Sequence, residues 1–280
     1  MSDKTPLQSA ISKVPMRSIG PAFMGGRIAD IAIHPTKKST WYLAVGSGGM
    51  WKTVNAGTTW TAIFEDQPSY SIGCVTIDPA QPDVIWVGTG EAVSGRHVAW
   101  GTGVYRSRNG GESWEHMGLD HSEHIGRILV DPRNSDVVYV AAEGPLWSSG
   151  GDRGVFKTTD GGSTWQHVLQ INADTGCTSL EFAPDDPDTI YAAAYQRRRR
   201  VWSFLGGGPH SGIYKTSNAG DTWREITQGL PEGDMGKIGL ATSPAAPDTV
   251  YATVEADKDC LLYTSPSPRD ATLSRMPSSA

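Results

Sequence analysis

The sequence predicts an all-β protein, a β-propeller of four-stranded antiparallel blades with four complete blades and one partial blade. Three observations predict this fold. An eight-residue motif ending in Trp occurs four times, about once every 50 residues. Before each motif, alternating apolar residues flank a Pro turn, which is the pattern of a strand hairpin. No segment has a helical period, and turn residues separate the short strands, as in a propeller.

The repeated motif has the properties of a tight hairpin turn. It reads hydroxyl, any residue, Asp or Asn, small residue, Gly, any residue, hydroxyl, Trp, and it occupies residues 53–60, 107–114, 158–165 and 216–223. The Asx side chain can accept backbone N–H bonds, the Gly tolerates positive φ, and the Trp can bury its ring under the turn. None of these groups is chemically reactive. Structural roles therefore fall to Asn55, Gly57, Trp60, Asn109, Gly111, Trp114, Asp160, Gly162, Trp165, Asn218, Gly220 and Trp223.

The strands around each motif define the blades. A first hairpin turns at each repeated Pro, a third strand precedes each motif, and the fourth strand starts at the motif Trp. The third strands are expected at residues 49–53, 103–107, 154–158 and 212–216. The propeller is expected over 25–259, with blades at 25–66, 67–119, 120–171 and 172–230 and a partial blade of two strands at 235–256.

The two ends of the sequence lack the repeat. Residues 1–24 form an N-terminal segment that we expect to supply a strand to the closing blade. Residues 260–280 have no blade pattern, and two stretches within them match, in order, the translation of a sequencing-library adapter. We therefore expect a non-native tail outside the fold, and a chain that is a fragment of a larger propeller.

Composition limits the partners. The formal net charge is −6, so nucleic-acid binding has no bulk electrostatic support. No run is long and apolar enough to span a membrane, and no signal peptide is present, which predicts a cytoplasmic protein from the chain as it stands. His121 and His124 are two ligands at most, too few for a metal site, and no cofactor motif occurs. The sequence does not specify an oligomeric state.

The motif is similar to the Asp box, or BNR repeat. Residues 15–256 resemble the repeat domain of sortilin-type and xyloglucan-hydrolase-type propellers, and most of all large bacterial repeat proteins described as glycosyl hydrolases. Proteins of this kind are often secreted or part of the cell envelope, unlike the cytoplasmic location predicted above. The box is a structural device shared by sialidases, glucanases and receptors, so the resemblance implies the fold and not an activity.

Two departures limit what the resemblance implies about catalysis. Sialidases carry Arg-Ile-Pro near the start of the propeller, whereas Arg27 and Ile28 are followed here by Ala29, which argues against sialidase chemistry. Xyloglucan hydrolases carry an acid in an Asp-Val-Gly-Gly-type segment of the first blade. The corresponding residues 24–27 are Met-Gly-Gly-Arg, so no catalytic Asp carries over.

The candidate site lies in the loops between second and third strands. Because strands alternate in direction, these loops and the links between blades should share the face opposite the Asp boxes. Residues 88–102, 142–153 and 194–211 form long loops, rich in charged residues and Trp. The catalytic candidates are Glu91 and Glu143, and the ligand-binding candidates are Arg96, His97, Trp100, Trp147, Arg153 and Trp202. The run 197–200, four Arg residues, is expected to be solvated.

Two functions remain open at this point. The first is a binding module for a protein, peptide or polysaccharide, with the ligand on the face opposite the Asp boxes. The alternative is a xyloglucanase-like glycoside hydrolase in which two loop carboxylates serve as acid and base. Whether the chain is an enzyme depends on the two Glu residues. Carboxylates that share an open cleft favour hydrolysis, and carboxylates that are each paired with Arg favour binding.

Overall fold

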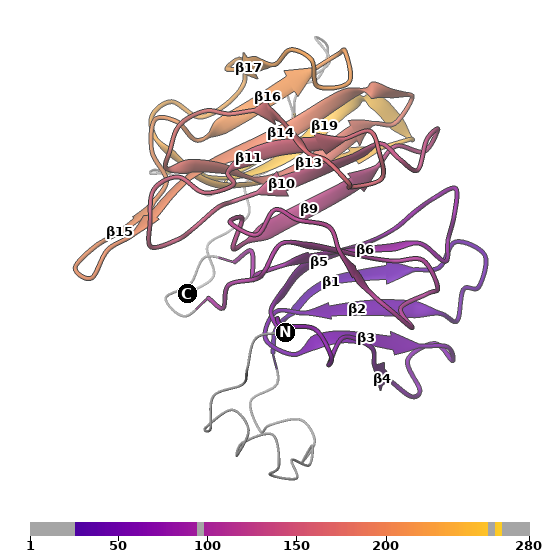
Figure 1. The fold of residues 1–280 in the computed structure, drawn as a ribbon. Helices are drawn as coiled ribbons and strands as arrows, with labels where there is room; N and C mark the ends of the chain where they lie inside the picture. Colours follow the sequence, from indigo (N-terminus) through magenta and orange to yellow (C-terminus); the bar gives the residue numbers. More distant parts are fainter. Residues whose placement is uncertain (1–25, 94–97, 257–260, 265–280) are drawn as a thin grey trace, which may run out of the picture.

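The computed structural model describes residues 26–93, 98–256 and 261–264 of the chain. This part of the chain contains twenty strands in five antiparallel sheets, which follow one another in chain order (Figure 1). The prediction of an all-β propeller fold is confirmed, since each sheet is a blade of consecutive strands. Within the same residues, no helix has the length and apolar character needed to cross a membrane. The closing strand expected in residues 1–24 lies outside the described residues.

The first three blades each have four strands in sequence order. The first blade contains β1 (Ile28–Ile33), β2 (Trp41–Val45), β3 (Gly49–Thr53) and β4 (Thr61–Ala62). The second contains β5 (Ile72–Ile77), β6 (Ile85–Thr89), β7 (Val104–Ser107) and β8 (Glu115–His116). The third contains β9 (Ile125–Val130), β10 (Val138–Ala142), β11 (Gly154–Thr158) and β12 (Gln166–Leu169). Each fourth strand begins directly after the box Trp, because the box turns the chain back along the third strand.

The fourth blade departs from the predicted four strands. It contains β13 (Thr175–Ala183), β14 (Asp186–Arg199), β16 (Gly212–Thr216) and β17 (Arg224–Ile226), and an additional strand β15 (Phe204–Gly206) pairs with the end of β14. β14 stays extended past the blade because the Arg199 amide donates to the Leu146 carbonyl over 2.8 Å. The β14–β15 hairpin therefore projects from the sheets (Figure 1).

The fifth blade has three strands where the sequence predicted two. It contains β18 (Met235–Ser243), β19 (Ala246–Ala256) and β20 (Leu261–Thr264), and β20 lies within the segment expected to stay outside the fold. An open sheet edge presents unpaired N–H and C=O groups, which can pair with any extended segment. This pairing is backbone complementarity and does not depend on a blade sequence.

β20 has the register of the other third strands but a different residue at one position. In the first four blades, a basic residue pairs with the aromatic residue of the second strand, as the pairs Tyr42–Lys52, Trp86–Arg106, Tyr139–Lys157 and Tyr191–Lys215. In the fifth blade, the residue opposite Tyr251 is Thr264. The position of the third-strand aromatic residue is kept, since Tyr263 pairs with Ala252 as Tyr214 pairs with Ala192. β20 therefore pairs in the blade register and lacks the basic residue opposite the second-strand aromatic residue.

The hydrophobic core lies between blades. Four clusters of buried residues each draw on two neighbouring blades, so the second, third and fourth blades pack against a neighbour on both faces. The second-to-third blade cluster joins Trp86 and Val104 to Ile128 and Val140, all at most 1% exposed. Apolar strand positions on both faces become buried in this way, as blade stacking requires.

The Asp boxes have the geometry that their sequence predicts. In the first box, Asn55 Oδ1 accepts the Thr59 amide over 2.9 Å, and Thr53 Oγ1 accepts the Gly57 amide over 3.0 Å. The same two bonds recur in the other three boxes at 2.8–3.1 Å. The motif glycines adopt φ between 86° and 92°, a backbone conformation that favours Gly.

Candidate functional site

The Asp boxes and the first turns of the blades share one face of the molecule. In each complete blade, the amide of the small box residue donates to a carbonyl in the turn between the first two strands. The four bonds join Ala56 to Ser39, Gly110 to Asp83, Gly161 to Asp136 and Ala219 to Asp188, at 2.8–3.0 Å. The loops between second and third strands leave from the other ends of the same strands. They are therefore on the opposite face, where the candidate residues were expected.

Glu91 lies just after β6 at this opposite face. Its side chain is 1% exposed, and Arg27 of the first blade contacts it with Nε at 2.9 Å and Nη2 at 2.5 Å. The space for it is provided by Gly46, where an added Cβ would come 2.4 Å from Glu91 Oε1. Glu91 is thus enclosed between two blades, and its charge is balanced by Arg27, which is 62% exposed.

Glu143 lies at the equivalent position after β10 and is also 1% exposed. Arg197 Nη1 contacts one oxygen at 2.5 Å, and Lys237 Nζ lies 3.4 Å from the other. Burial disfavours the charged form, but Lys237, Arg197 and His124 outweigh it and hold the pKa of Glu143 below its ordinary value. Glu143 therefore joins the third, fourth and fifth blades as an ionised group.

The two Glu residues do not form an acid–base pair. A general acid must hold a proton at working pH, which requires a raised pKa, whereas the pKa of Glu143 is lowered. Each carboxylate is buried and bound to basic residues from other blades, so neither reaches a substrate in this geometry. The arrangement is that of internal anchors between blades.

Arg153 and Arg197 lie inside the protein, in contrast to the sequence-based expectations. Arg153 is 3% exposed and donates to carbonyl oxygens of its own loop, those of Glu143, Pro145, Ser148 and Gly150. Burial lowers its pKa to about 10. Arg197 is 2% exposed and bound to Glu143, although it belongs to a run expected to be solvated. Residue type alone did not reveal that these guanidinium groups point inward.

Exposed aromatic side chains distinguish the loop face. Trp100, Trp147 and Trp202 are 66%, 51% and 81% exposed, so they do not plug gaps between blades. The guanidinium carbon of Arg199 lies 5.7 Å from the Trp147 ring and 5.5 Å from the Phe204 ring. Arg96 and His97, the other predicted ligand-binding residues, lie outside the described residues.

We name Trp147, Arg199 and Phe204 the aromatic stack. Sequence reasoning selected Trp147 but missed Arg199 and Phe204 as partners. The available signal was period two along β14, since Arg197 and Arg199 lie on one side of an extended strand and Arg198 on the other. What no pattern showed is that β14 runs past the blade and meets the loop that carries Trp147.

Comparisons with known proteins place this geometry in context. Residues 102–265, more than half of the chain, match the family model Sortilin-Vps10, described as sortilin, neurotensin receptor 3. A xyloglucanase from Hypocrea jecorina is 26% identical over 236 residues, which cover 72% of this chain and 26% of that protein. The chain spans about a quarter of the length of the curated relatives that it matches.

Solved structures support the same fold. An ancestral GH74 enzyme superposes with a TM-score of 0.64 at 19% identity, over 90% of this chain and 32% of that chain. The GH74 enzyme of Niastella koreensis gives a TM-score of 0.60, also at 19% identity, over 85% of this chain and 37% of that chain. At this identity the likeness concerns the fold alone.

Proposed function

The chain belongs to the Sortilin-Vps10 family of Asp-box propellers, and we propose that it binds polysaccharide as a non-catalytic module, through the aromatic stack and Trp202. The observation that carries the proposal is Arg199 of the projecting hairpin, whose guanidinium contacts Phe204 of the same hairpin and Trp147 in the loop of the third blade. Aromatic planes suit the C–H faces of sugar rings, and a guanidinium group supplies fixed donors for hydroxyl oxygens.

The relatives favour a polysaccharide over other ligands. The curated matches are named as xyloglucanases, so β-linked glucans of the xyloglucan class are the first ligands to test. A protein or peptide partner was the other class expected from the sequence, and no contact in the described residues points to one. Hydrolysis is not proposed, because Glu91 and Glu143 are both buried in ion pairs.

Isothermal titration with soluble xyloglucan tests the proposal. We expect saturable binding, and at least a tenfold loss of affinity when Trp147 and Trp202 are both replaced by Ala, since truncating aromatic anchors commonly costs more than about 1.4 kcal/mol. Val54→Ala is a matched control, because Val54 is 63% exposed but lies in the box at residues 53–60 on the other face.

Two outcomes contradict the proposal. Unchanged affinity in the double Trp variant would remove the aromatic stack from the binding surface. Release of reducing sugar from xyloglucan by the wild-type chain would contradict a non-catalytic module and favour the hydrolase alternative.

A further inference from the structure

The β14–β15 hairpin differs from the rest of the chain in its charge. Residues 189–217, which contain the hairpin, include four Arg and one Lys and no Asp or Glu. The whole chain, in contrast, carries a formal net charge of −6. The hairpin is therefore a basic segment on an acidic protein, and a local concentration of one charge attracts ligands of the opposite charge.

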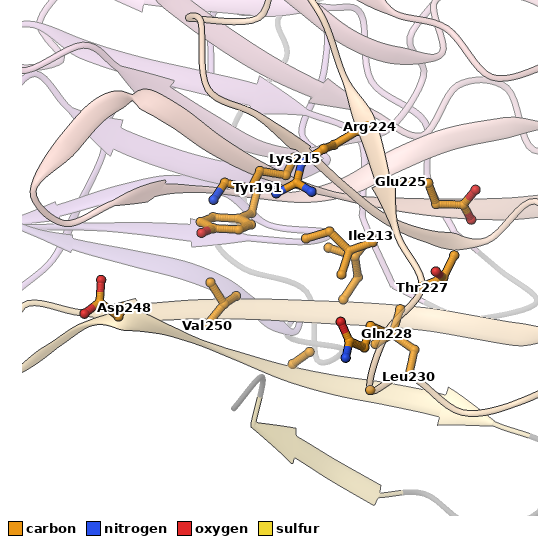
Figure 2. Close-up of a pocket in the computed structure, with 13 residues that line it drawn as sticks. Tyr191, Ile213, Lys215, Arg224, Glu225, Thr227, Gln228, Leu230, Asp248 and Val250 are labelled. Atoms are coloured by element: carbon orange, nitrogen blue, oxygen red, sulfur yellow. The ribbon is translucent and has the colours of Figure 1, made fainter. Parts of the chain in front are cut away.

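Two of these basic residues are engaged away from the hairpin surface. Arg197 is 2% exposed and bound to Glu143. Lys215 lines the cavity between the fourth and fifth blades, where its Nζ lies 5.2 Å from the centroid of the Tyr191 ring (Figure 2). The basic residues that remain for the hairpin surface are Arg198, Arg199 and Arg200.

Arg199 is held in position without a carboxylate partner. Among the described residues, no carboxylate oxygen lies within 4.0 Å of its nitrogens. Its neighbour Arg198, on the other side of the strand, lies 3.9 Å from Asp174. Arginines elsewhere are paired more closely, since Arg106 and Arg133 each contact a carboxylate at 2.6–2.7 Å. The Arg199 guanidinium therefore keeps its donors for a ligand.

The two rings beside Arg199 stay accessible to a ligand. Trp147 and Phe204 are 51% and 40% exposed, and Phe204 is the residue directly opposite Arg199 in the hairpin register. Aromatic rings suit the C–H faces of sugars, whereas the planar guanidinium matches the two oxygens of a carboxylate. A neutral glucan would use the rings and leave the guanidinium without the acceptor that it binds best.

We propose that the aromatic stack binds an acidic polysaccharide, in which Arg199 holds the carboxylate of a uronate sugar that lies against Trp147 or Phe204. This inference rests on the proposed polysaccharide binding and names the class of sugar that the site selects. Arg200 is exposed at the start of the hairpin turn and adds a second positive charge. Selection for the carboxylate follows because charge-assisted hydrogen bonds are roughly twice as strong as neutral ones.

Isothermal titration with two matched oligosaccharides tests the proposal on the full chain. One is a cello-oligosaccharide, and the other has the same length with every glucose oxidised to glucuronate, so the two differ only where a carboxylate replaces a hydroxymethyl group. At low salt, we expect the wild-type chain to bind the glucuronate form at least about tenfold more tightly. Raising the salt from about 50 to about 200 mM should reduce this preference, because salt screens exposed charges.

Arg199→Met isolates the guanidinium. Methionine keeps an apolar side chain between the two rings and removes the charge, so the two oligosaccharides should bind with similar affinity. Arg108→Met is the matched control, because Arg108 is 63% exposed but lies in the second Asp box on the other face. It should keep the wild-type preference. The backbone pairs of the hairpin do not involve the Arg199 side chain, and circular dichroism checks that both variants fold.

Three outcomes overturn the proposal. Equal affinity of the wild-type chain for the two oligosaccharides would overturn the acidic ligand and leave polysaccharide binding in place. Failure to bind either oligosaccharide, or xyloglucan, would overturn the proposed function as well. A preference that survives in Arg199→Met, or that is lost equally in Arg108→Met, would overturn the role of Arg199.

Two further measurements identify the source of the anion. Free glucuronate should displace the bound oligosaccharide more effectively than inorganic phosphate at the same concentration, and equal displacement would overturn the assignment to a sugar. Sedimentation with phosphatidylglycerol vesicles tests a lipid surface, since Val201 and Trp202 are 87% and 81% exposed in the hairpin turn. Vesicle binding that Arg199→Met abolishes would assign the hairpin to lipid headgroups and overturn the proposal, whereas absence of vesicle binding supports it.

Discussion

The two faces of the propeller are stabilised by contacts of different range. On the Asp-box face, the bonds within each box join residues two to four positions apart, and the four boxes have nearly the same geometry. On the loop face, ion pairs join residues 64 and 54 positions apart, and no two loops use the same partners. Hydrogen bonds within each repeat therefore stabilise the Asp-box turns, whereas ion pairs between blades stabilise the loop face, which is the surface proposed to bind ligand.

Removing Arg197 should produce the largest effect. Arg197→Met leaves the buried Glu143 with Lys237 alone at 3.4 Å, and we expect a loss of about 3 kcal/mol in the free energy of unfolding. Urea denaturation measures it. Arg198→Met is the control, because Arg198 is partly exposed and its contact with Asp174 is long, at 3.9 Å. We therefore expect this substitution to lower the free energy of unfolding only slightly. Equal losses in the two variants would contradict the comparison of the faces.

The pH dependence of the Arg197 pair has a defined sign. The folded pKa of Glu143 is lowered, so the pair stabilises the fold above the pKa of an unfolded Glu, about 4.3. That contribution is lost as the pH falls through the lower folded pKa. The stability difference between wild type and Arg197→Met should therefore shrink in acid.

A box glycine should have the next largest effect. Gly162 has φ of 90°, and a Cβ there would come 3.0 Å from Met117 Cε and from Trp86 Cη2 of the preceding blade. Gly162→Val should lower the free energy of unfolding by about 1–3 kcal/mol. Gly150→Val separates strain from contact, since Gly150 has φ of 81° with nothing within 4 Å of the added Cβ. Thermal or urea denaturation measures both variants. A larger loss of stability in Gly150→Val than in Gly162→Val would contradict packing of the box against the preceding blade as the cause of the Gly162 effect.

The third box should be the acid-sensitive box. A hydrogen bond from the Thr164 side chain is the largest of several that lower the pKa of Asp160 to about 2. The ionised Asp160 carboxylate therefore stabilises the fold above the pKa of an unfolded Asp, about 3.9, and this stabilisation is lost as the pH falls towards 2. Asp160→Asn should remove this loss in melting curves between pH 5 and 2.

The other boxes carry Asn with the same bonds, as in Asn218, whose Oδ1 accepts the Thr222 amide over 3.0 Å. Asn218→Asp is thus the reciprocal variant and should introduce the same acid dependence into the fourth box. Parallel acid curves for wild type and both variants would exclude a role for this carboxylate.

Removing residues 260–280 should have the smallest effect. β20 pairs with β19 without the aromatic–basic pair of the other blades, so it adds little beyond backbone bonds at an open edge. We expect a change in melting temperature below about 2 °C by calorimetry. A fall of several degrees would show that this segment is part of the fold.

The sequence by itself determined the repeat, the boxes and the direction of each strand. These features depend on residues within a few positions of one another, so side-chain type and spacing specify them: Asx with hydroxyl residues for the turn, Gly for positive φ, alternating apolar residues for the strand. The third strands predicted at 49–53, 154–158 and 212–216 coincide with β3, β11 and β16.

Only the tertiary structure decided what the charged and aromatic loop residues do. Glu91 and Glu143 become anchors because basic residues of other blades reach them, and Arg153 turns inward to bind the carbonyls of its own loop. Trp147 joins Arg199 because β14 extends beyond its blade. Such contacts join residues far apart in the chain, and the burial that selects them exists only once the blades are stacked, so no local pattern of residues records them.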